Sequence, residues 1–171
     1  MKKGYLSVNT GDGKGKTTAA VGQALRALGA GYSVYVGQFL KSDRSGEIRI
    51  LREISSKVVT ETYGIERNVG SPMTGRDREA AKEGLTRLKK AIDDGYDLVI
   101  ADEILVAMSS GLLEESELLD LMKSKPESVE LVMTGRGATQ AIIGRADVVT
   151  EMVEIKHHYR LGVQAREGIE R

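Results

Sequence analysis

A glycine-rich segment between an apolar run and a helical pattern constrains this chain more than any other feature. It spans Thr10 to Thr18 and reads Thr-Gly-Asp-Gly-Lys-Gly-Lys-Thr-Thr. The apolar run before it, Tyr5 to Val8, predicts a strand, and helical periodicity begins at Thr17. Glycines in such a turn let backbone N–H groups curl around phosphate oxygens, and the dipole of the following helix adds to the attraction. The segment therefore predicts a phosphate-binding loop.

The chemistry expected of this loop follows from its side chains. Lys16 supplies a positive charge to the phosphates, and the Thr17 hydroxyl is suited to Mg²⁺. The common pattern has glycine five residues before Gly15, where this chain has Thr10. A glycine-rich turn without a ligand is the alternative, but a strand and a periodic helix flank the segment. We therefore predict nucleotide contacts from the whole loop, namely Thr10, Gly11, Asp12, Gly13, Lys14, Gly15, Lys16, Thr17 and Thr18.

A second element places two carboxylates at the end of a buried strand. Four apolar residues, 98–101, precede Asp102 and Glu103. In P-loop folds we expect such a strand beside the first strand, where its carboxylates supply the hard oxygen ligands that Mg²⁺ on a triphosphate needs. Alone, an apolar strand that ends in Asp-Glu is equally well a structural feature. Together with the Gly-Lys-Thr loop, it predicts a Mg-nucleotide site.

Strand-like and helix-like stretches alternate along the chain, with no linker or repeat between them. This alternation predicts an α/β fold of the P-loop NTPase-like (RecA-like) type, a mostly parallel β-sheet with helices on both faces. We expect a single domain over residues 1–171. The predicted strands cover 5–8, 33–40, 58–63, 98–101, 131–133 and 148–155. One predicted helix begins at 17, one ends at 51, and three cover 76–94, 114–123 and 140–145, with a long loop at 64–75.

Composition excludes several other classes of protein. Twenty-five Lys and Arg balance twenty-five Asp and Glu, so no overall field favours nucleic acid or an anionic membrane. The absence of cysteine excludes disulfides, thiolate metal sites and a cysteine nucleophile. No apolar run approaches the roughly 20 residues of a membrane-spanning helix. We expect no nucleic-acid or membrane partner, and a cytoplasmic location.

Several short motifs occur in an order that resembles a known family. They are the loop at 10–18, Val36-Gly37-Gln38-Phe39-Leu40-Lys41, Gly46-Glu47, Asp102-Glu103, Thr134-Gly135-Arg136, and a tail that runs from Thr150-Glu151-Met152 through Lys156-His157 to Gly168-Ile169-Glu170. This series resembles the P-loop ATP:corrinoid adenosyltransferases of cobalamin synthesis and salvage. The resemblance covers nearly the whole chain, and the loop and the Lys-His tail are its most specific parts.

The resemblance implies a function: transfer of the 5′-deoxyadenosyl group of ATP to the Co(I) centre of a corrinoid, with release of inorganic triphosphate. Co(I) is itself the nucleophile, so no protein nucleophile or general base is needed. By this resemblance Lys16, Thr17 and Glu103 are the catalytic residues. Lys16 neutralises the departing triphosphate, Thr17 and Glu103 hold Mg²⁺, and Asp102 orients the metal shell or the loop. The family also implies a homodimer, and a flavin-type reductase protein as a partner.

Other motif residues carry less specific predictions. Lys41 follows the second strand and is predicted to meet phosphate or a corrin carboxamide, with a solvated lysine as the alternative. Arg136 follows a strand end and is predicted to reach the triphosphate, with a surface arginine as the alternative. His157 and His158 are adjacent, and on a strand they would point to opposite faces, which argues against joint metal ligation.

The chain departs from the family in the loop after the third strand. Family members carry a Gly-Phe-Thr-Trp segment there, whose aromatic rings pack under the corrin ring and favour cobalt reduction. This chain has no tryptophan, and Phe39 is its only phenylalanine. Candidate replacements are Tyr63, Ile65, Val69 and Met73, with less contact area than an indole. The corrinoid that is accepted and the ease of cobalt reduction stay open.

Two other functions fit parts of the sequence. A P-loop kinase or NTPase acting on another small molecule would yield ADP, although no arginine-rich lid is evident. A non-catalytic ATP- or corrinoid-binding protein would bind both ligands without turnover, which the missing aromatic pair allows. The phosphate product separates these alternatives, because only adenosyl transfer yields triphosphate.

Overall fold

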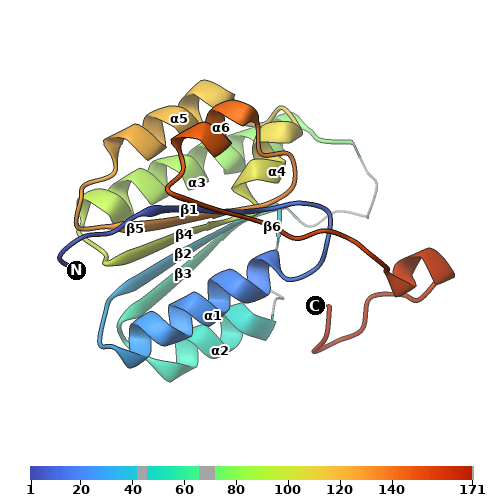
Figure 1. The fold of residues 1–171 in the computed structure, drawn as a ribbon, viewed down its shortest axis with the longest axis horizontal. Helices are drawn as coiled ribbons and strands as arrows, with labels where there is room; N and C mark the ends of the chain where they lie inside the picture. The colour runs from blue at the N-terminus through green and yellow to red at the C-terminus, as the bar shows by residue number, and fades with distance from the viewer. Residues whose placement is uncertain (42–45, 66–71, 171) are drawn as a thin grey trace.

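Six parallel strands form one sheet, with helices on both of its faces (Figure 1). The computed structural model of the chain describes residues 1–41, 46–65 and 72–170. The order across the sheet is β3-β2-β4-β5-β1-β6. In chain order the strands are β1 (Leu6–Thr10), β2 (Val34–Phe39), β3 (Val58–Tyr63), β4 (Leu98–Asp102), β5 (Glu130–Thr134) and β6 (Val148–Glu151). The predicted α/β fold with a parallel sheet is confirmed.

The helices form two layers, one on each face of the sheet. They are α1 (Lys16–Gly29), α2 (Gly46–Ile54), α3 (Gly75–Asp93), α4 (Ile104–Ser109), α5 (Glu115–Ser124) and α6 (Gln140–Arg145). The short 3-10 helix η1 (His158–Leu161) lies in the C-terminal tail, apart from both layers (Figure 1). Figure 1 shows α1 and α2 on one face and α3 to α6 on the other. Each layer buries its own apolar cluster against the sheet. No helix within the described ranges is long and apolar enough to cross a membrane.

Local sequence explains why the best-defined elements form where they do. β4 reads Leu-Val-Ile-Ala-Asp with every residue buried, as expected of a strand covered on both faces. Thr74 begins α3 with a capping box, in which its hydroxyl accepts from the Asp77 N–H while the Asp77 carboxylate accepts from the Thr74 N–H. α3 then buries Ala81, Leu85 and Leu88 along one stripe. The bounds of β3 and α6 are those predicted.

Two predictions about the elements are wrong, and two short helices, α4 and η1, were not predicted. β5 lies between β1 and β4, so the strand that carries the carboxylates is not beside the first strand. The final strand ends at Glu151 rather than at 155, because its partner β1 ends at Thr10. The sequence pattern does not reveal α4, which at six residues is too short to show helical periodicity.

α1 bridges the two strands that β5 separates. It begins at Lys16, within the glycine-rich segment, and packs across β1, β5 and β4. All strands are parallel, so the ends of β1 and β4 lie at the same edge of the sheet. Thr17, in the first turn of α1, therefore reaches the end of β4 in spite of the intervening strand.

Candidate nucleotide site

The glycine-rich loop curls around the ammonium group of its own lysine. Lys16 Nζ donates to the carbonyl oxygens of Gly11, at 2.6 Å, and Gly13, at 2.7 Å. Gly11 and Gly15 have φ angles of +94° and +115°, a left-handed backbone that favours glycine. Burial lowers the pKa of Lys16, and the nearby Glu103 carboxylate opposes that shift. The buried ammonium is thus held at the centre of the loop, where it would meet a phosphate.

Several backbone N–H groups of the loop remain open to an anion. No hydrogen bond in the described part of the chain uses the N–H groups of Lys14, Gly15 or Lys16. The N–H of Gly13 is occupied, because it donates to the carbonyl oxygen of Met152 at 2.6 Å. The predicted cradle over residues 11–15 is therefore concentrated at the end of the loop that opens α1.

Asp102 is the hub of the site. Its carboxylate is buried, and its Oδ1 accepts from the hydroxyls of Thr17, at 2.8 Å, and Thr134, at 2.7 Å. Oδ2 accepts from the Gln38 amide at 2.9 Å and from the Lys41 ammonium at 3.1 Å. Burial by itself raises the pKa of Asp102, but the Lys41 charge and the hydrogen bonds outweigh it and hold that pKa below its usual range. Asp102 is an ionised anchor with four donors, a geometry that fits its predicted orienting role.

Glu103, the next residue, has the opposite environment. Its backbone is left-handed at φ +61°, and its N–H donates to Thr134 Oγ1 at 2.9 Å. Its carboxylate forms no hydrogen bond or ion pair with any residue in the described ranges. Burial, and then the neighbouring Asp102 charge, raise the pKa of Glu103 against the attraction of Lys41 and Lys16. A partly buried carboxylate without a partner, beside the loop lysine, fits a metal ligand.

Arg136 and Lys14 extend the site to the surface. Arg136 Nη2 donates to the backbone oxygen of Asp12 at 3.4 Å, and its Nε lies 3.6 Å from Asp12 Oδ1. Lys14 Nζ donates to Glu170 Oε1 at 2.6 Å. Thr18 is exposed on α1. The structure thus brings Arg136 from the end of β5 to the glycine-rich loop, while its contact with triphosphate stays a prediction.

The segment after β6 packs directly on the glycine-rich loop. A Cβ atom on Gly11 would lie 2.4 Å from the Met152 oxygen, and one on Gly13 would lie 2.8 Å from both Met152 and Val153 backbone atoms. Only glycine fits this approach, so these two positions serve the packing of the tail on the loop. Sequence reasoning missed the contact. The sequence hints at this contact in one way: the tail and the loop belong to the same series of family motifs.

The two histidines do not lie on a strand, so the argument from opposite strand faces against joint metal ligation does not apply to them. They stand at the start of η1, and their ring centroids are 4.8 Å apart. His157 Nδ1 accepts from the Tyr159 N–H, and His158 Nε2 lies 3.4 Å from Glu170 Oε1. Among the described residues, no group of three or more His, Asp or Glu side chains is arranged to hold a metal ion.

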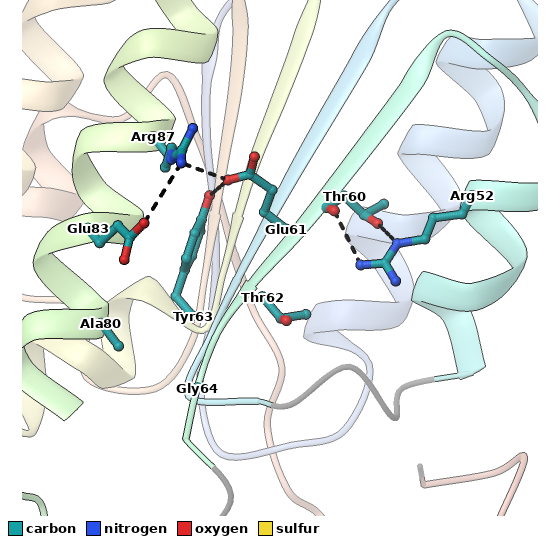
Figure 2. Close-up of a pocket in the computed structure, with 9 residues that line it drawn as sticks. All are labelled: Arg52, Thr60, Glu61, Thr62, Tyr63, Gly64, Ala80, Glu83 and Arg87. Atoms are coloured by element: carbon teal, nitrogen blue, oxygen red, sulfur yellow. Dashed lines mark hydrogen bonds and ion pairs between the residues drawn. The ribbon is translucent and has the colours of Figure 1, made fainter. Parts of the chain in front are cut away.

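A separate cavity of about 350 Å³ lies along β3, the strand at the far edge of the sheet from β1 and β6 (Figure 2). Arg52 lines one side, where its Nε donates to Thr60 Oγ1 at 2.6 Å and its Nη2 to the Thr60 carbonyl oxygen at 3.3 Å. Arg87 and Glu83 of α3 line the other side, 3.9 Å apart. No residue of the predicted nucleotide site lines this cavity.

The contacts of Tyr63 show why it does not replace the missing aromatic pair. Its hydroxyl donates to Glu61 at 2.6 Å (Figure 2). The hydroxyl also contacts that of Tyr35, and the buried ring lies 5.4 Å from the Phe39 ring. Burial, together with the hydrogen bond to Glu61, raises the pKa of Tyr63 far above its usual value. Tyr63 is therefore a core residue. Of the other candidates, Ile65 and Met73 are partly exposed, and Val69 lies outside the described residues.

Fold and loop together define an α/β protein of the P-loop NTPase-like class. The solved structure of the RadB recombinase has the same fold, with a TM-score of 0.56 over 91% of this chain and 78% of that chain, at 14% identity. The family model described as ATP:corrinoid adenosyltransferase BtuR/CobO/CobP matches residues 2–171. The chain belongs to this family, which confirms the resemblance in the motifs.

Curated relatives support the same membership over the full chain. The corrinoid adenosyltransferase of Pseudomonas aeruginosa is 36% identical over 99% of this chain and 84% of its own length. The corrinoid adenosyltransferase of Escherichia coli strain K12 is 34% identical over 99% of this chain and 86% of its own length. The protein named corrinoid adenosyltransferase CobA in Salmonella typhimurium is 33% identical over 99% and 86%, respectively.

Proposed function

We propose that this chain transfers the 5′-deoxyadenosyl group of ATP to the Co(I) centre of a corrinoid, in cobalamin biosynthesis or salvage. Family membership over residues 2–171 supports the reaction. The main support for ATP binding is the 2.8 Å hydrogen bond from the Thr17 hydroxyl to Asp102, which joins the glycine-rich loop to the carboxylate pair. In the transfer, the electron pair of Co(I) forms a Co–C5′ bond while the C5′–O bond breaks, and that bonding pair leaves with triphosphate.

The protein has two tasks in this reaction, alignment and charge neutralisation. The cobalt, C5′ and the leaving oxygen have to lie in line, and the departing triphosphate needs positive charge around it. Lys16 at the centre of the loop supports the second task, with the N–H groups at the start of α1. Arg136, held against Asp12 at the rim, is placed to add a second charge.

We propose that Thr17 and Glu103 hold a Mg²⁺ ion together with triphosphate oxygens. Thr17 donates its single hydroxyl hydrogen to Asp102, which leaves its oxygen lone pairs for a cation. The unpartnered carboxylate of Glu103 lies beside the same loop. Oxygen ligands of this kind suit Mg²⁺, which when bound would neutralise charge on the triphosphate.

The surroundings of the enzyme are also proposals. The family resemblance predicts a cytoplasmic homodimer that receives electrons for cobalt from a flavin-type reductase. Light scattering coupled to size exclusion measures the oligomeric state, and a mass near that of one 18.5 kDa chain would reject the dimer.

The decisive experiment mixes the protein anaerobically with Mg-ATP and chemically reduced cob(I)alamin. We expect loss of the Co(I) spectrum, formation of a light-sensitive alkylcobalamin, and triphosphate in equal amount. ADP with untouched cobalt would instead support a kinase or NTPase. Tight ATP binding without either product would support a non-catalytic binding protein, or a different corrinoid as substrate.

A further inference from the structure

Lys41 occupies the position at which a cation would approach Thr17. Its ammonium donates to Thr17 Oγ1 at 3.2 Å and to Asp102 Oδ2 at 3.1 Å. Thr17 Oγ1 gives its only hydrogen to Asp102 Oδ1, so the Lys41 N–H meets a lone pair of the hydroxyl oxygen. A metal ion bound to Thr17 needs a lone pair of the same oxygen. The ammonium and a metal ion therefore compete for one place.

The backbone around Lys41 fixes this position. Leu40, the residue before it, is one of two non-glycine residues with positive φ in the described ranges, at +60°. This left-handed turn directly after β2 is costly for leucine. On the other side, a Cβ atom on Gly64 would lie 2.4 to 2.6 Å from the backbone of Lys41. A strained residue and a tight glycine contact together hold Lys41 against the end of β4.

We propose that the Lys41 ammonium is a tethered cation that fills the metal position at Thr17 in the nucleotide-free protein and has to leave it when a metal-nucleotide binds. The proposal rests on the metal role proposed for Thr17. Its consequence is an order of binding: the free protein binds divalent metal weakly, and the metal enters with the nucleotide. The side chain of Lys41 is 32% exposed, so it has room to move away, whereas Asp102 at 2% does not.

Electrostatics explains why the exchange favours the nucleotide complex. In the free protein the ammonium neutralises the buried Asp102 carboxylate, and a divalent ion would have to approach two lysines, Lys41 and Lys16. A triphosphate brings several negative charges to the same place. These charges offset the repulsion between the metal ion and the two lysines, and they give the displaced ammonium a new partner. The charge of the bound nucleotide would therefore decide whether the Lys41 ammonium or a metal ion lies beside Thr17.

The test measures Mn²⁺ binding, in place of Mg²⁺, by electron paramagnetic resonance of the free ion without nucleotide. We expect Lys41→Met to bind Mn²⁺ at least tenfold more tightly than the wild-type protein. Lys57→Met is the matched control, because the Lys57 ammonium lies at the opposite end of the sheet, where it donates to the Gly31 carbonyl oxygen at 2.7 Å. It removes the same charge and should leave Mn²⁺ affinity unchanged. In the double variant Lys41→Met/Thr17→Val the gain should disappear.

Equal Mn²⁺ affinities of the wild-type protein and Lys41→Met would overturn the proposal, and so would a gain that survives the Thr17→Val change. Lys41→Gln provides a second variant if Lys41→Met does not fold. The result is separable from the proposed reaction. Normal adenosyl transfer with equal Mn²⁺ affinities rejects only the tethered cation, whereas the expected affinities without adenosyl transfer reject only the reaction.

Discussion

Two lysines near the nucleotide site each pair with a carboxylate, but in different surroundings. Lys41 and Asp102 meet at the buried end of β4, 3.1 Å apart, where the Asp102 side chain is 2% exposed. Lys14 and Glu170 meet at the surface, 2.6 Å apart, where the Lys14 side chain is 47% exposed. We expect the loss of the shorter contact to cost less stability, because water screens the exposed Lys14 ammonium, whereas removal of one partner of a buried pair leaves the other charge uncompensated. Burial, rather than the distance between the charged atoms, therefore decides which pair matters more for stability.

The largest effect is expected from removing the buried carboxylate. Asp102→Ala leaves four donors without their acceptor, and we expect the free energy of unfolding to fall by about 3 kcal/mol. Urea denaturation measures it, with Glu170→Ala as the counterpart from the surface pair, which should lower the midpoint less. Equal losses in the two variants would remove the distinction between the regions.

Acid should erase the same difference. The pKa of Asp102 is depressed in the folded protein, so its stabilisation is present above the unfolded value of about 4 and is lost as the pH falls through the folded value. The gap between wild type and Asp102→Ala should therefore be constant from neutral pH down to about 5 and shrink below that. A gap that widens in acid would contradict the assignment.

The second effect concerns the lysine inside the loop. Lys16→Ala removes the charge at the centre of the proposed triphosphate site, and we expect adenosyl transfer to slow by about 100-fold or more. Stopped-flow loss of the Co(I) spectrum measures the rate, with Lys57→Ala as the control for a lost lysine. A rate near that of the wild type would reject the proposed phosphate site.

A smaller effect of opposite sign is expected at Glu103. Its pKa is raised in the folded protein, so the ionised carboxylate costs stability as the pH rises from the unfolded to the folded value. Glu103→Gln should be more stable than the wild type by up to about 1 kcal/mol at neutral pH, with no gain below about pH 4. Mn²⁺ binding in the presence of ATP should weaken at least tenfold. A variant less stable than the wild type at neutral pH would contradict this reading.

The smallest effect is expected at the surface pair. Glu170→Gln frees Lys14 for a phosphate, and we expect ATP to bind no more than about threefold more tightly, with less gain at high salt. Isothermal titration at two ionic strengths measures it, and Glu167→Gln, a neighbouring exposed carboxylate, is the control. A tenfold change would show that the tail governs access to the loop.

Sequence patterns predicted the strands and most helices because burial imposes a period on them. β4 is apolar on both faces, and α3 has an apolar stripe, so both are visible in the sequence. The glycine-rich loop and the pair Asp102 and Glu103 are local motifs, so the sequence pointed to them as well. The strand order is different. Nothing in the local sequence indicates that β5 lies between β1 and β4.

The contacts that build the site are mostly nonlocal, and that is why the sequence could not predict them. Asp102 gathers donors from β2, from the loop that follows β2, from α1 and from β5, and only the folded sheet brings these together. The packing of Met152 on Gly13 has the same origin. Tyr63 shows the opposite case. Its place in the sequence made it a candidate contact for the corrinoid, but its side chain is buried in the core.

The guanidinium of Arg52 has a consequence for self-association. β3 is the outermost strand at its end of the sheet, and an outermost strand offers unpaired carbonyl groups to any extended chain that approaches. Arg52 Nη2 donates to the Thr60 carbonyl oxygen at 3.3 Å and so occupies one acceptor that an added strand would need. A seventh strand could dock beside β3 only after breaking this contact. This single side chain thereby hinders fibre-like growth at the β3 edge of the sheet.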